Sequence, residues 1–194
     1  MGVFLLADSF ASAQTITVSL EGEIPTIAEG LELTQPRDTL IIQQGTYFEH
    51  NLIVDKPITI IGEGRPVLDG EKKGFILVIT SDDVTVKGLE VRNTSTSFME
   101  DYAGILIEKT KNTVIEDNRL IDNFFGIYLA ETDKAVIRNN YLSASGERET
   151  SSGNGIHLWY SKDTKIENNY VRGHRDGLYF EFVDGANITN NLSE

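Results

Sequence analysis

Cysteine is absent from this chain of 194 residues, which excludes disulfides and cysteine-ligated metal sites. Soft metal ligands are few, because the chain has only three histidines and two methionines. No apolar run approaches the roughly 20 residues that cross a bilayer, so we expect no membrane span. With only four prolines, the composition is that of an ordinary globular or solenoid protein.

Positive charge is also scarce. Lysine and arginine number 17 against 30 aspartates and glutamates, which gives a formal net charge of -13. A surface of this sign repels nucleic acids and anionic membranes. We therefore expect no nucleic-acid partner, and cations, neutral sugars or other proteins remain as candidates.

The first residues resemble the end of a secretory leader. An apolar run over residues 3–7 precedes the small-x-small sequence Ala11-Ser12-Ala13, although no basic residue comes first and Asp8 interrupts the run. We interpret residues 1–13 as the remnant of a signal peptide of an exported protein, and residues 14–194 as one β-helix domain. The alternative is a short tag or a frayed start.

Internal repetition is what the chain has in abundance. From Gly104 onward, a glycine followed by alternating apolar residues recurs with a step of 22 or 29 residues. The same steps separate the residues that open five similar segments, which are Val86, Ile115, Ile137, Ile166 and Ile188. Self-similarity at this period is typical of a solenoid.

Each repeat is too short to fold alone. Apolar residues alternate on either side of a polar turn, which indicates three short strands in about 22 residues. Such coils must stack, and the pairs at 117–118, 139–140, 168–169 and 190–191 then align an asparagine column that can form a ladder of amides. The pattern predicts an all-β fold, a right-handed parallel β-helix.

The two ends differ from the middle. Residues 24–33 alternate poorly as a strand, so we expect one short helix after Pro25 that caps the N-terminal end of the solenoid. The last residue, Glu194, falls inside a repeat. We therefore expect the β-helix to be truncated at its C-terminal end.

Two runs of residues carry a family resemblance. The segments Gly45-Thr46-Tyr47-Phe48-Glu49, Lys56-Pro57-Ile58-Thr59-Ile60-Ile61-Gly62 and Leu68-Asp69-Gly70 resemble the opening of the pectin-lyase-like right-handed β-helix superfamily. The later run is more specific. Gly155-Ile156-His157-Leu158-Trp159-Tyr160-Ser161, Asn168-Asn169 and Arg175-Asp176-Gly177-Leu178-Tyr179-Phe180 resemble the NosD family of periplasmic β-helix proteins.

The resemblance to NosD implies a non-enzymatic role in maturation of the copper site of nitrous oxide reductase, in the periplasm. The implied partners are the membrane and ATPase subunits of an ABC transporter, a copper chaperone lipoprotein and nitrous oxide reductase itself. Copper is implied for the full-length protein. No cofactor is expected in this segment, because the family's methionine- and histidine-rich turns would begin beyond Glu194.

The outward positions of the glycine-led strand form the candidate binding face. One column holds Tyr128, His157 and Tyr179 after Leu106, and a second holds Trp159 and Glu181 after Glu108 and Ala130. Insertions over residues 94–103 and 143–154 enter just before this strand and should wall the same face. The face is either a groove, with Arg175, Asp176 and Glu181 as polar contacts, or a set of aromatic residues covered by these loops.

A metal site would need His157 together with Met99, brought over it by the first insertion. The alternative is that the histidines are solitary and exposed. No catalytic residue is assigned. The alternative function is a polysaccharide-binding or polysaccharide-cleaving β-helix, a lyase, hydrolase or epimerase, for which Asp176 and Glu181 are the nearest acidic pair.

Overall fold

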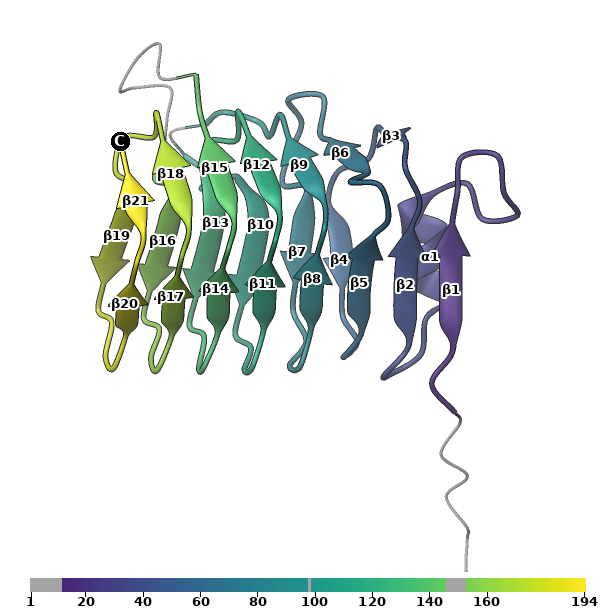
Figure 1. Ribbon diagram of the computed structural model, residues 1–194, viewed down its shortest axis with the longest axis horizontal. Helices are drawn as coiled ribbons and strands as arrows, with labels where there is room; N and C mark the ends of the chain where they lie inside the picture. The colour runs from purple at the N-terminus through teal and green to yellow at the C-terminus, as the bar shows by residue number, and fades with distance from the viewer. Residues whose placement is uncertain (1–11, 98, 146–152) are drawn as a thin grey trace, which may run out of the picture.

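The structure is a computed structural model that describes residues 12–97, 99–145 and 153–194. The chain winds into a right-handed parallel β-helix, with coils stacked from β1 and α1 at one end to β19, β20 and β21 at the other (Figure 1). The leader predicted for residues 1–13 lies almost entirely outside the described residues.

Three parallel sheets form the sides of the β-helix, and neighbours in each sheet come from successive coils. The first sheet contains β1 (Thr15–Val18), β2 (Thr39–Ile42), β5 (Thr59–Gly62), β8 (Thr85–Lys87), β11 (Val114–Glu116), β14 (Val136–Arg138), β17 (Lys165–Glu167) and β20 (Asn187–Thr189). The second contains β3 (Thr46–Tyr47), β6 (Val67–Asp69), β9 (Glu90–Arg92), β12 (Arg119–Ile121), β15 (Tyr141–Ser143), β18 (Tyr170–Arg172) and β21 (Leu192–Ser193). The third contains β4 (Leu52–Val54), β7 (Leu77–Ile79), β10 (Ala103–Glu108), β13 (Phe125–Ala130), β16 (Ile156–Trp159) and β19 (Leu178–Glu181).

The register confirms the predicted columns. Ile115 pairs with Val86 on one side and with Ile137 on the other, and Ile137 pairs with Ile166. The inward residues of all three sheets form one continuous core, in which side chains such as Ile105, Ile127, Ile137 and Leu142 are fully buried. Each coil is too small to bury its own apolar side chains, and stacking on neighbouring coils buries them.

The asparagine ladder forms as predicted at the bend between the first and second sheets. The Nδ2 atom of Asn118 donates to Oδ1 of Asn140 at 3.3 Å, and Asn140 donates to Asn169 at 3.0 Å. Asn169 continues the ladder to Asn191 at 2.9 Å. Each second amide hydrogen reaches a backbone carbonyl, as Asn140 does with Ile115, so the buried amides are well satisfied.

The predicted helix forms over a shorter range than residues 24–33. Helix α1 spans Ile27–Leu33, because Thr26 accepts a hydrogen bond from the backbone N–H of Glu29 as an N-cap. Its buried face contributes Ile27 and Leu31 to the core, and it contacts β1, β2 and β4. Its role as a cap remains a prediction.

The early coils contain strands that the repeat did not predict. Strands β1 to β4 lie within the first 54 residues, where coil lengths vary and the sequence has no fixed period. In the part of the chain that the structure describes, no helix is long and apolar enough to cross a membrane.

Candidate functional site

The outer face of the third sheet carries both predicted columns. Tyr128 pairs with His157, and His157 pairs with Tyr179. In the second column, Trp159 pairs with Ala130 on one side and with Glu181 on the other. We call Tyr128, His157 and Tyr179 the stripe.

The rings of the stripe touch one another from coil to coil. The centroids of Tyr128 and His157 are 4.6 Å apart, and those of His157 and Tyr179 are 5.0 Å apart. Phe125, which the sequence analysis did not select, packs 5.3 Å from His157 and 5.5 Å from Tyr128. These distances are those of favourable aromatic pairs, so the stripe is a preorganised stack.

The expectation of solitary, exposed histidines is wrong for His157, whose side chain lies between neighbouring rings and is only 8% exposed. The Nδ1 atom of His157 lies 3.2 Å from the side-chain amide nitrogen of Asn154. The Oδ1 atom of Asn154 accepts a hydrogen bond from Arg175 at 3.1 Å. Burial lowers the pKa of His157, although the nearby carboxylates of Asp101 and Glu181 oppose this. The ring is therefore neutral at neutral pH.

The first insertion lies against the stripe. Burial raises the pKa of Tyr128 to about 12, and the negative charge of Asp101 in this insertion adds to the rise. Tyr102 packs edge-on against Phe75, with centroids 5.0 Å apart. In the second insertion, residues 146–152 lie outside the described residues, and Asn154 holds its end beside His157.

The predicted metal pair is not assembled. Met99 is 91% exposed, whereas His157 is buried, so the first insertion does not fold the thioether over the imidazole. Among the described residues, no group of three or more His, Cys, Asp or Glu side chains is placed to hold a metal ion. His157 and Met99 are therefore not brought together as a pair of soft ligands in the described part of the chain.

The polar candidates lie at the edge of the stripe. Arg175 forms an ion pair with Asp176, with 3.1 Å between Nε and Oδ2. Glu108 and Glu181 occupy the same column three coils apart, which is about 14 Å at the spacing of parallel strands. That separation exceeds the roughly 6.5–9.5 Å of an inverting glycosidase pair, so Glu108 and Glu181 do not form one. The acidic pair named from the sequence, Asp176 and Glu181, lies within one coil, and the charges of both carboxylates act on His157.

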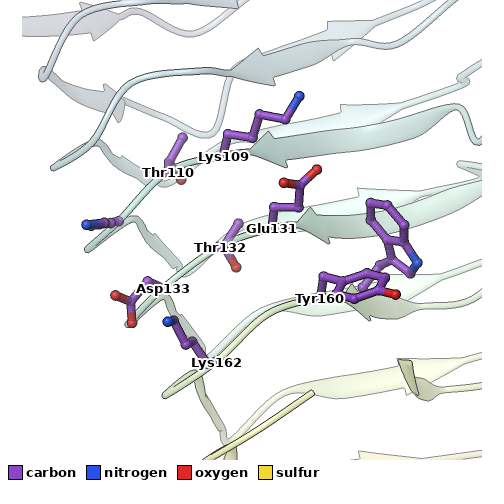
Figure 2. Close-up of a pocket in the computed structure, with 9 residues that line it drawn as sticks. Lys109, Thr110, Glu131, Thr132, Asp133, Tyr160 and Lys162 are labelled. Atoms are coloured by element: carbon purple, nitrogen blue, oxygen red, sulfur yellow. The ribbon is translucent and has the colours of Figure 1, made fainter. Parts of the chain in front are cut away.

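A further group of residues, which the sequence analysis missed, lies at the bend between the third and first sheets. Tyr160 and Phe182 stack at 4.6 Å, and Trp159 meets Tyr160 edge-on at 4.7 Å. Beside them is a surface groove of about 610 Å³, lined by Lys109, Thr110, Lys111, Glu131, Thr132, Asp133, Trp159, Tyr160 and Lys162 (Figure 2). We call it the corner groove. Tyr160 directly follows Trp159 in the sequence, and this adjacency could have indicated that it belongs to the same surface.

Comparisons with known proteins agree with the fold. A family model described as "Right handed beta helix region" matches residues 74–194. The catalytic domain of a GH87 α-1,3-glucanase, solved in complex with nigerose, superimposes with a TM-score of 0.69. The match covers 96% of this chain and 37% of that one, at 15% sequence identity, so it concerns the fold alone.

Two curated proteins are similar in sequence, and both are named "Probable ABC transporter binding protein NosD". The protein from Pseudomonas aeruginosa is 34% identical over 129 residues, which is 66% of this chain. The protein from Stutzerimonas stutzeri is 27% identical over 132 residues, which is 67% of this chain. The chain spans about 30% of the length of either relative.

Proposed function

Because this chain belongs to the family of right-handed β-helix proteins, whose rigid coils present long side-chain columns, we propose that it is a non-catalytic docking scaffold for an ABC transporter. It acts outside the cytoplasm, in the periplasm, after export. The observation that carries the proposal is the 34% identity with a protein named "Probable ABC transporter binding protein NosD".

The stripe is the surface that we assign to docking. Tyr179 continues a stack in which His157 is held by ring contacts and by Asn154. Rigid aromatic side chains of this kind lose little entropy on binding and often dominate interfaces. Arg175, Asp176 and Glu181 would form the polar rim of this interface.

At the finer level, we propose that the transporter system serves maturation of the copper site of nitrous oxide reductase, with its membrane and ATPase subunits and a copper chaperone lipoprotein as partners. In this segment, the proposed contribution is docking, since the isolated His157 and the distant Met99 offer too few soft ligands. Copper is the cargo of the system.

A capture experiment tests the proposal. The purified chain is immobilised and presented with a detergent-solubilised ABC transporter from the organism that produces the chain. We expect saturable capture that Tyr179→Ala weakens at least about tenfold, as expected for an interface anchor. The matched control is Tyr170→Ala, which removes the same side chain from a stacked pair on the second sheet.

Three outcomes would contradict the proposal. The docking role is wrong if the unaltered chain fails to capture the transporter, and the assignment to the stripe is wrong if Tyr179→Ala and Tyr170→Ala behave alike. Release of soluble sugars from pectate, alginate or a glucan by the purified chain would show catalysis and would replace the scaffold function by an enzymatic one.

A further inference from the structure

One column of side chains at the corner groove departs from what its backbone favours. Lys109, Glu131, Tyr160 and Phe182 occupy the same bend on successive coils, each with a positive φ, from 47° at Tyr160 to 54° at Lys109 and Glu131. This left-handed conformation is uncommon for any residue but glycine, and it favours asparagine and aspartate among the rest. Bulky aromatic residues are poor choices for it.

The other bends of the same coils follow that preference at every position named here except Lys134. The bend before the asparagine ladder holds Asp117, Asn139, Asn168 and Asn190, all with positive φ. The bend that leads into the first sheet holds Asn112, Lys134, Asp163 and Gly185. The corner column contains no asparagine, aspartate or glycine. Its side chains therefore serve a purpose other than forming the bend.

Core packing is not that purpose. Tyr160 is 52% exposed although coils flank it on both sides. Its ring stacks on that of Phe182, with an interplanar angle of 24°. Exposed, preordered rings beside a groove are the arrangement of a binding platform.

The corner groove offers hydrogen-bonding groups of both kinds. Its volume of about 610 Å³ lies within the range of small-molecule sites. Figure 2 shows Lys109, Glu131 and Tyr160 following one another down the right side, with Asp133 and Lys162 to their left. The rim thus provides ammonium donors and carboxylate acceptors.

The charges alternate in sign along the coil axis. Lys111 pairs in register with Asp133, Asp133 with Lys162, and Lys162 with Asp184. A regular polyanion or polycation laid along this column would meet a like charge on every second coil. Hydroxyl groups both donate and accept hydrogen bonds, so a neutral polyol can satisfy every position.

We propose that the corner groove binds a neutral saccharide chain. The sugar rings stack on Trp159 and Tyr160, and their hydroxyl groups bond to the lysines and to the carboxylates of Glu131 and Asp133. Phe182 extends the platform by one coil. This site is separate from the stripe and does not depend on the proposed docking to a transporter.

The single tryptophan of the chain reports directly on this site, since Trp159 lines the groove. Its fluorescence is followed while maltohexaose, cellohexaose, laminarihexaose, chitohexaose or trigalacturonate is added to the full chain. We expect a saturable change with at least one of the neutral oligosaccharides and none with trigalacturonate. Tyr160→Asn should weaken that binding at least about tenfold, as for the loss of an aromatic anchor.

Asparagine suits the positive φ of position 160, so this variant keeps the fold, which its urea midpoint verifies. The matched control, Tyr170→Asn, should bind as the unaltered chain does. The proposal is wrong if no neutral oligosaccharide binds at millimolar concentration, or if Tyr160→Asn binds equally well. Binding of trigalacturonate would overturn the choice of a neutral ligand. If no sugar binds and Tyr160→Asn instead reduces capture of the transporter, the corner is a protein interface and the saccharide proposal fails.

Discussion

Two bends of each coil adopt the same left-handed backbone conformation but carry side chains of opposite character. Asn139, next to the ladder, and Tyr160, at the corner groove, both adopt a positive φ, of 55° and 47°. Beside Asn139, the ladder residue Asn140 is buried and bonded to the coils above and below. Tyr160 is half exposed and stacks on another exposed ring.

The comparison shows which positions of a repeat are constrained by stability and which are free to serve a function. Where a coil needs its neighbours for stability, the same residue type returns on each coil, because any other would leave buried polar groups unpaired. Where the residue type changes from Lys109 to Glu131 to Tyr160, stability does not specify the side chain. Such columns are where binding functions can be placed at little cost to the fold.

The largest effect is expected on the ladder side. Asn140→Ala removes the acceptor for the buried backbone N–H of Asn118 and a donor to each of Ile115 and Asn169. Since each buried group left unpaired costs about 1–3 kcal/mol, we expect a loss of about 4 kcal/mol in the free energy of unfolding. Urea denaturation followed by circular dichroism measures it.

The matched control is the adjacent Asn139→Gly. Residue 139 is exposed and keeps its positive φ with glycine at little cost. Its free energy of unfolding should stay within about 1 kcal/mol of the unaltered chain. Equal losses for the two variants would mean that the ladder contributes no more than the bend does.

The next largest effect is a pH dependence expected from His174, which lies between β18 and β19 beside the end of the second insertion. Burial lowers the pKa of His174 to about 4, and the backbone of Gly153 and the charge of Asp122 only partly oppose this. The unfolded chain, with an ordinary histidine pKa of about 6.5, binds the proton more readily. Stability is therefore full above about pH 6.5 and falls as the pH drops, by roughly 3 kcal/mol in total.

His174→Leu isolates this contribution. The difference in unfolding free energy between the unaltered chain and the variant, measured by urea titration at several pH values, should shrink as the pH falls from 7 to 4. His157, whose pKa burial also lowers, remains in both proteins and cancels in the difference. A difference that is constant with pH would show that His174 is not held neutral.

The strict columns made most of the fold predictable. Ile115, Ile137 and Ile166 recur with the asparagines at fixed offsets, and this spacing is enough to place both in register. Strands β1 to β4 were not predicted because their coils have unequal lengths. The helix follows Pro25 as expected, and it begins at Ile27 because Thr26 supplies the N-cap.

The site was less accessible to sequence reasoning. Alternation placed Tyr128, His157 and Tyr179 on one outer column. It could not reveal that His157 is buried, because the neighbours that cover it come from Phe125 and from Asn154 in the second insertion. Tyr160 was missed because its outward direction follows from a left-handed bend, which breaks the alternation of the strand before it.

The smallest effects are expected from exchanging residue types between the two bends. Tyr160→Asn loses ring contacts with Trp159 and Phe182 but relieves an unfavourable φ, so we expect a change within about 0.5 kcal/mol. Asn139→Tyr places a bulky residue at a positive φ with no ring beside it to compensate, and should cost about 1 kcal/mol. Urea midpoints measure both. If Tyr160→Asn proved as destabilising as Asn140→Ala, the corner column would be structural, and its aromatic residues would need no ligand to explain them.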